Sequence, residues 1–126
     1  MEMDHTMNEK LNRLHLPQKF INKIQHDLAY ILSYELEDLQ QVILIGSCAR
    51  GKVKATSDVD WMIVTSSPIE DKSLRHRILG DICDEWNGVS GDLIFTTTQQ
   101  RLERNTSFMK IVAEDEVILW EREDTR

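Results

Sequence analysis

The chain has few of the features that mark secreted or membrane-bound proteins. Only two of its 126 residues are cysteines and only two are prolines. Cys48 lies in a suspected loop and Cys83 in a helix-like segment, so the pattern does not indicate a disulfide framework. No apolar run is long enough to span a bilayer, and the N-terminus lacks the basic and then apolar pattern of a signal peptide. We therefore expect a cytoplasmic protein that does not enter membranes.

The chain also lacks an excess of positive charge. Its 15 basic and 22 acidic residues give a formal net charge of −7. General binding to DNA or RNA needs a basic face, so this balance argues against it. A nucleotide substrate remains compatible with the charge, because a bound metal ion reverses the sign of the local field. A hydrophobic content of 40% suits one domain over 1–126, with an N-terminal lead-in at 1–15 and a polar tail at 121–126.

Apolar periodicity predicts helices alternating with a few short strands. The predicted helices cover 17–38, 70–87 and, in two pieces, 98–113. The predicted strands cover 41–46, 59–65, 89–97 and 117–120. Pro17 suits the first turn of a helix, and Asn87 with Gly88 should end the second one. This order predicts an α/β or α+β fold, with helices packed on one side of a short sheet.

Two neighbouring segments carry the clearest chemistry. Asp58 and Asp60 stand two positions apart at the start of an apolar strand, so their side chains point to the same face. Two adjacent carboxylates repel each other, and a cation such as Mg²⁺, shared with substrate phosphates, relieves that repulsion. Gly46 and Ser47 end the preceding apolar strand, where glycine lets the backbone approach a phosphate and serine offers a hydroxyl and an N–H.

Each of these residues also has a plain structural interpretation. The aspartate pair can be solvated acids at a strand start, and Ser47 can be a helix N-cap. Arg50 can be an exposed cation or part of a structural ion pair. Taken alone, an Asp-x-Asp motif is weak evidence for a metal site.

The stretch from Gly46 to Val64 reads GSCARGKVKATSDVDWMIV. The Gly-Ser pair, the ten residues between Ser47 and Asp58, the Ser-Asp-x-Asp string and the apolar flanks together resemble the signature of the polymerase-β-like nucleotidyltransferase superfamily. The resemblance is strongest to its small, single-domain branch, the minimal nucleotidyltransferases. It covers most of the chain, from the helix before Val42 to the strand at 117–120.

The resemblance implies a nucleotidyltransferase fold, in which a short mixed sheet gathers the aspartate pair and a third carboxylate on one face. Asp92 is the candidate for the third position, because an apolar strand follows it as one follows the pair; it can also be a plain carboxylate at a strand edge. The implied catalytic and metal-binding residues are Asp58, Asp60 and Asp92, holding one or two Mg²⁺ ions. The implied binding residues for the nucleoside triphosphate, ATP, are Gly46, Ser47, Arg50 and Ser57.

The resemblance also implies a partner. Minimal nucleotidyltransferases are commonly paired with an all-helical toxin of the HEPN class. This predicts an antitoxin that transfers AMP from ATP to a hydroxyl, often a tyrosine, of the toxin. Larger relatives add a domain that binds the acceptor, and only six residues follow Trp120, so we expect the acceptor to come from another subunit or protein.

Two other functions remain open from the sequence. The chain can be a non-catalytic module that neutralises a toxin by binding it. It can also be an adenylyltransferase for a small molecule such as an antibiotic, with the acceptor pocket completed by a homo-oligomer. The sequence fixes neither the base preference nor the acceptor.

Overall fold

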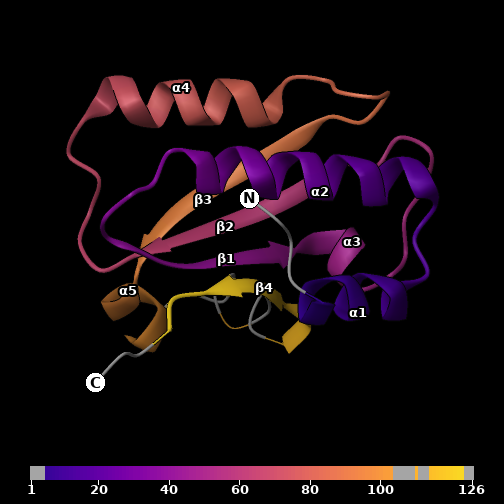
Figure 1. Ribbon diagram of the computed structural model, residues 1–126, viewed down its shortest axis with the longest axis horizontal. Coiled ribbons are helices and arrows are strands. Elements are labelled where there is room, and N and C mark those ends of the chain that lie inside the picture. Colours follow the sequence, from indigo (N-terminus) through magenta and orange to yellow (C-terminus); the bar gives the residue numbers. More distant parts are fainter. Residues whose placement is uncertain (1–4, 104–109, 111–113, 124–126) are drawn as a thin grey trace.

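The structure is a computed structural model that describes residues 5–103, 110 and 114–123. Figure 1 shows a twisted sheet with helix α2 running across it. The helices are α1 (His5–Leu14), α2 (Gln18–Ser33), α3 (Gly46–Ala49), α4 (Lys72–Cys83) and α5 (Thr98–Glu103). The strands are β1 (Leu39–Ile45), β2 (Val59–Thr65), β3 (Gly91–Thr97) and β4 (Val117–Glu121). The α+β fold predicted from the sequence is confirmed.

The sheet is mixed, with the strand order β3-β2-β1-β4. β1 is antiparallel to both β2 and β4, whereas β2 and β3 run parallel. The end of β1 and the starts of β2 and β3 therefore lie at the same end of the sheet. The register places Ile45 opposite Asp60 and Asp60 opposite Asp92.

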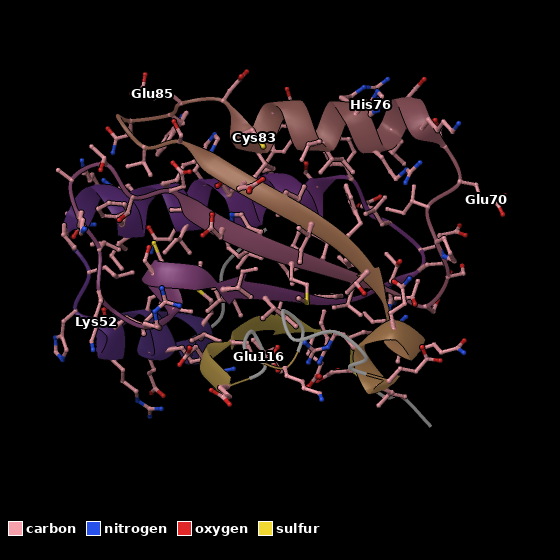
Figure 2. The ribbon with its side chains drawn as sticks, turned by 180° about the vertical axis from the view of Figure 1, so that it is seen from behind. Lys52, Glu70, His76, Cys83, Glu85 and Glu116 are labelled. Atoms are coloured by element: carbon pink, nitrogen blue, oxygen red, sulfur yellow. The ribbon has the colours of Figure 1, made fainter. Side chains whose placement is uncertain are left out.

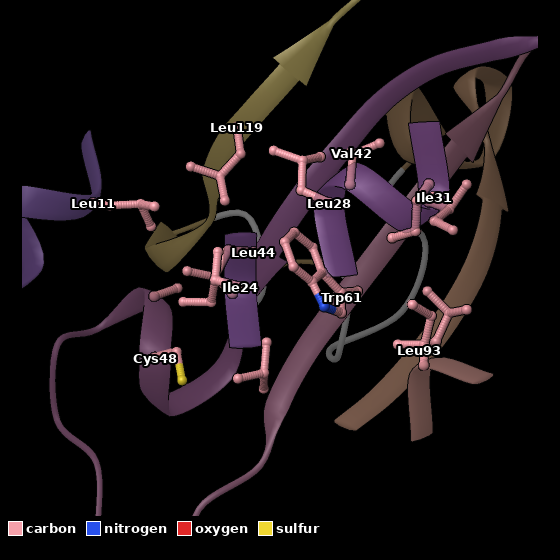
Figure 3. Packing of buried hydrophobic residues seen from close by; sticks show 14 of the residues in the cluster. Leu11, Ile24, Leu28, Ile31, Val42, Leu44, Cys48, Trp61, Leu93 and Leu119 are labelled. Atoms are coloured by element: carbon pink, nitrogen blue, oxygen red, sulfur yellow. The ribbon is translucent and has the colours of Figure 1, made fainter. Parts of the chain in front are cut away.

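The two faces of the sheet are covered unequally, because side chains alternate between them. One face packs against α2 and α4 in the main core, where Trp61 is fully buried (Figure 3). The buried residues of the other face form a smaller cluster of Ile43, Ile45, Met62 and Val64. Asp60 and Asp92 have the same parity along their strands as this second set. The helices therefore cover mainly one side, and the candidate carboxylates belong to the other.

Both long helices are shorter than the apolar periodicity predicts. α2 ends at Ser33 rather than at 38, because Tyr34 caps it and Glu35 adopts a left-handed φ of 51°. α4 begins at Lys72 rather than at 70, after Asp71 accepts a hydrogen bond from the Leu74 N–H in the manner of an N-cap. It ends at Cys83 rather than at 87.

Asn87 and Gly88 form a two-residue hairpin turn instead of ending a helix. Their φ angles are 54° and 79°, and Trp86 and Val89 pair across the turn in an antiparallel bridge. Asn-Gly is the preferred sequence for such a turn, because both positions need a positive φ. Trp86 is consequently 38% exposed rather than buried in the core, and it stacks on His26 with ring centroids 4.1 Å apart.

The ends of the chain differ in detail from the sequence reading. The lead-in at 1–15 contains α1, whose Met7 and Leu11 are buried in the main core. Of the helical region predicted at 98–113, the first piece is α5, and 104–109 and 111–113 lie outside the described residues. Of the polar tail, Glu121 ends β4 and 124–126 also lie outside. Among the described helices, none has the length and apolar character needed to cross a membrane.

Candidate active site

Gly46 begins the short helix α3 immediately after β1, and its backbone lies against a carboxylate. It has a φ of +74°, a conformation that residues with side chains rarely adopt. A Cβ atom at this position would stand 2.3 Å from the Oδ2 atom of Asp60. Glycine is therefore needed twice, for the backbone turn and for the contact. The turn at Gly46 therefore lies directly against the Asp60 carboxylate.

Three acidic residues converge at this end of the sheet. Asp60 and Asp92 are directly paired in the parallel ladder of β2 and β3. Asp58 precedes β2 by one residue and is exposed, as is Asp92, whereas Asp60 is half-buried. The resemblance implies that Asp92 joins the Asp58–Asp60 pair; the structure pairs Asp92 with Asp60, and the catalytic and metal-binding roles of the three residues stay a prediction.

The electrostatics of Asp60 show how close these groups are. Burial is the largest influence on its pKa, and the charges of Asp92 and Asp58 act in the same direction. Together they raise the pKa of Asp60 from 3.8 to about 6, against a smaller opposing effect of Arg50. A carboxylate that is costly to ionise beside two others is one that a cation would stabilise strongly.

Arg50 and Ser57 lie on the loop between α3 and β2. Arg50 is exposed, and its Nη1 atom is 3.9 Å from the Oδ2 atom of Asp115, which no motif in the sequence singled out. Ser57 closes a turn: its hydroxyl accepts the Lys54 N–H at 2.8 Å, and its own N–H donates to the Lys54 carbonyl at 3.0 Å. The charge of Arg50 is close enough to Asp60 to lower the pKa of that carboxyl, whereas Ser57 shapes the loop that leads into β2.

The two cysteines border the acidic cluster without forming a nucleophilic site. Cys48 is fully buried in α3, and its thiol lies 3.6 Å from the Asp58 carbonyl oxygen. Burial, followed by the charges of Asp60 and Asp58, raises the pKa of the Cys48 thiol to about 12. Burial and the charge of Asp92 likewise raise the pKa of Cys83. Both thiols stay protonated at neutral pH, so they are neither activated nucleophiles nor ready metal ligands.

The donor set fits a magnesium ion that is shared with a substrate. Within the described residues, no group of three or more His, Cys, Asp or Glu side chains has the geometry to hold a metal ion by itself. Asp92 directs its Oδ1 atom to the Leu93 N–H at 2.8 Å. Hard oxygen donors are what Mg²⁺ prefers, and it is usually held by one or two carboxylates plus substrate phosphates. A site built on Asp58 and Asp60 and completed by a triphosphate has this composition.

Figure 2 shows where the loops that flank this cluster lie in the molecule. Lys52, on the loop before β2, and Glu85, on the loop before β3, lie at the same end, and Glu70 lies at the opposite end. The acidic cluster is therefore bordered by two loops that lead directly into its strands.

The family described as "Nucleotidyltransferase domain" matches this chain over residues 29–125. No curated protein has a sequence that matches it. Among solved structures, a nucleotidyltransferase-like protein from Sulfolobus solfataricus is 20% identical with a TM-score of 0.56, and the alignment covers 97% of this chain and 93% of that one.

Two toxin-antitoxin structures share the fold less completely. One, solved with AMP-PNP, is 18% identical with a TM-score of 0.52. The other, a mutant of the toxin-antitoxin MntA-HpeT, is 16% identical with a TM-score of 0.51. Each alignment covers 78% of this chain and 73% of the other. At these identities the likeness shows the fold, a nucleotidyltransferase fold as the sequence motif implied.

Proposed function

The chain belongs to the nucleotidyltransferase domain family, and from that premise we propose that it is a Mg²⁺-dependent adenylyltransferase. Its donor is ATP, its acceptor is a tyrosine hydroxyl on a HEPN-type toxin, and the modification makes it an antitoxin. The toxin partner follows from the resemblance to the minimal nucleotidyltransferase branch. The fold that the chain shares with two toxin-antitoxin structures, one of them with AMP-PNP, supports this proposal.

One observation carries the enzymatic part of the proposal. A glycine turn touches the Asp60 carboxylate, and Asp60 is paired with Asp92 across two parallel strands. A strand-start acid in an ordinary solvated position would not need glycine at the facing residue. The contact brings the backbone at Gly46, the residue before Ser47, next to the carboxylate that would hold a metal.

The roles of the side chains follow from their places. Asp58 and Asp60 would hold Mg²⁺, which when bound screens the charge of the triphosphate and favours attack at its α-phosphorus. The Gly46–Ser47 turn would bind the β- and γ-phosphates, and Arg50 would offset negative charge on the leaving group. Positioning and charge stabilisation of this kind supply most of the rate in phosphoryl-type transfers.

Asp92 would act on the acceptor. Its carboxylate is exposed and directly beside Asp60, so an acceptor hydroxyl could reach both. The hydroxyl oxygen forms a bond to the α-phosphorus, the bond from that phosphorus to the bridging oxygen breaks, and pyrophosphate leaves. The hydroxyl proton passes to Asp92, which is suited to the role of general base by its position.

A direct experiment tests the proposal. The protein is mixed with ATP, Mg²⁺ and the helical protein encoded beside it, and the partner is weighed by mass spectrometry. We expect an added adenylyl group on a tyrosine, and none with an Asp58→Asn/Asp60→Asn variant. Glu70→Gln, an exposed acid at the opposite end of the molecule, is the matched control and should leave transfer unchanged.

The outcomes separate the three functions. A partner that is neutralised without any mass change, also by the double variant, would mean that the chain acts by binding alone. Transfer to an aminoglycoside in the absence of any protein partner would identify a small-molecule adenylyltransferase. Wild-type protein that neither binds ATP with Mg²⁺ nor modifies the toxin contradicts the enzymatic proposal.

A further inference from the structure

A buried polar network lies on the face of the sheet opposite to the carboxylates. Lys23 and Asp27, four residues apart on α2, are both 0% exposed and form an ion pair with 3.0 Å between Nζ and Oδ1. The Lys23 ammonium also donates to the carbonyl oxygens of Ile82 at 2.9 Å and Asp84 at 3.3 Å. The second oxygen of Asp27 accepts the indole N–H of Trp61 at 3.0 Å. The three ammonium protons and both carboxylate oxygens therefore have partners.

The two ends of this network reach the two strands that carry the paired carboxylates. Trp61 follows Asp60 directly in β2, and Figure 3 shows its indole in the main core, on the helix side of the sheet. On the other strand, a Cβ at Gly91 would stand 2.3 Å from the Ile82 carbonyl oxygen, so β3 begins in direct contact with the end of α4. Gly91 precedes Asp92. Asp27 is thus hydrogen-bonded to β2 through Trp61. Lys23 is hydrogen-bonded to the C-terminal end of α4, which contacts the start of β3.

The free energy lost when the ion pair is buried indicates that its contribution is precise geometry rather than stability. Burying an ammonium and a carboxylate loses their hydration, and apolar residues of similar size often give an equal or more stable core. Apolar contacts are non-directional, however, whereas hydrogen bonds fix both distance and angle. Directed bonds are useful here because two carboxylates that repel each other across a ladder tend to separate the strands that carry them.

We propose that Lys23 and Asp27 are positioning residues. Acting through Trp61 and Ile82, they fix the spacing of the two paired carboxylates on the opposite face of the sheet. That spacing sets the affinity for Mg·ATP and the rate of transfer. The inference rests on the proposed function for the reaction that it tunes, and it adds residues that lie outside the sequence motif.

The decisive variant is Lys23→Met/Asp27→Leu, which removes both charges together and leaves no buried ion unpaired. Measured at a temperature where all proteins are folded, it should bind Mg·ATP and transfer AMP roughly 10–100-fold less well, as is typical when groups that orient metal ligands are lost. Two opposing effects act on its melting temperature, because the desolvated charges are removed while the buried Trp61 N–H loses its acceptor. The melting temperature is therefore measured first, and activity is compared well below it. Trp61→Phe, which removes the indole N–H together with part of the buried ring system, tests the β2 connection and should lower the same two quantities to a smaller extent.

Tyr30→Phe is the matched control. The Tyr30 hydroxyl contacts the Asp81 carboxylate and so also joins α2 to α4, but its hydrogen-bond partners, Asp81 and Tyr34, belong to neither β2 nor β3. It should leave Mg·ATP affinity and transfer unchanged. A loss of activity in this variant equal to that in the double variant would mean that any weakening of the helix layer suffices, which overturns the specific role of the network.

Failure of the inference is distinguishable from failure of the proposed function. If the wild type binds Mg·ATP and the folded double variant binds it equally well and transfers equally fast, the pair is only part of the core. If the wild type binds no Mg·ATP, the proposed function fails instead. In that case, crystal structures of the wild type and the double variant test the inference. An unchanged Cα separation of Asp60 and Asp92 in the double variant overturns it.

Discussion

Replacing Asp60 with asparagine should stabilise the ligand-free protein at neutral pH while abolishing its activity. The carboxylate is half-buried beside Asp92 and Asp58, and its ionised form is correspondingly unfavourable. Asparagine has nearly the same shape, so it should fit against Gly46 without creating a cavity. In the proposed function, the charge that this change removes serves ligand binding at the expense of stability, as charges at functional sites often do.

The size and the pH range of the stabilisation by Asp60→Asn follow from the pKa of Asp60. In the folded protein burial raises the pKa of Asp60 from 3.8 to about 6, so the folded state binds this proton more tightly than the unfolded chain. The destabilisation is absent below the unfolded pKa, increases as the pH rises between the two values, and is constant above the folded one. The full difference corresponds to ~3 kcal/mol at ~1.36 kcal/mol per pKa unit, and solvent screening of a half-buried group reduces it to ~1–1.5 kcal/mol.

Thermal unfolding at two pH values tests this reasoning. At about pH 8, Asp60→Asn should melt roughly 4–6 °C above the wild type, and at about pH 4 most of the difference should disappear. Glu70→Gln removes one exposed negative charge and corrects for the change in net charge. Added Mg·ATP should raise the melting temperature of the wild type but not that of the variant. The same difference at both pH values, or a less stable variant at the higher one, would refute the electrostatic argument.

Two further substitutions test other parts of the site. Gly46→Ala places a Cβ 2.3 Å from the Asp60 Oδ2 atom at a φ of +74°, and the strain should cost about 1–3 kcal/mol in denaturant unfolding and eliminate Mg·ATP binding measured by calorimetry. Wild-type affinity in this variant would show that the turn moves freely. Asp92→Asn changes an exposed residue, so stability should change by no more than about 0.5 kcal/mol. Steady-state kinetics should show kcat reduced by roughly 10²–10⁴-fold with little change in KM for ATP, as for loss of a general base; a raised KM with unchanged kcat would instead assign Asp92 to binding.

The sequence predicts the fold well where the signal is local. Apolar runs locate all four described strands, and β2 is predicted at the residues it occupies, 59–65. The Gly46–Ser47 turn and the Asp58–Asp60 pair follow from motif spacing. That Asp92 lies opposite Asp60 also follows from the resemblance, once the two strands are neighbours.

The sequence predicts helix ends, turns and buried polar pairs less well, because contacts with distant segments determine them. Helical periodicity continues past Ser33, but Glu35 turns the backbone so that β1 can begin. The Asn87–Gly88 dipeptide is typical both of a helix end and of a hairpin turn, and in the structure Trp86 and Val89 pair across it as a hairpin. Lys23 and Asp27 look like ordinary polar positions on a helix. A sequence signal was nevertheless present, because both interrupt the otherwise apolar stripe of α2 at an i,i+4 spacing.

The position of β1 in the sheet has a consequence for how the chain folds. β1 pairs early with β2, from which it is separated by one short helix and a loop, but its other edge must wait for β4. Lys10 of α1 then donates to the Ile118 carbonyl at 2.6 Å, a contact across 108 residues of sequence. Closing such a long chain segment is entropically costly and slow. A nascent chain should therefore expose the unpaired edge of β1 until β4 leaves the ribosome, and aggregation during synthesis should be most acute in that interval.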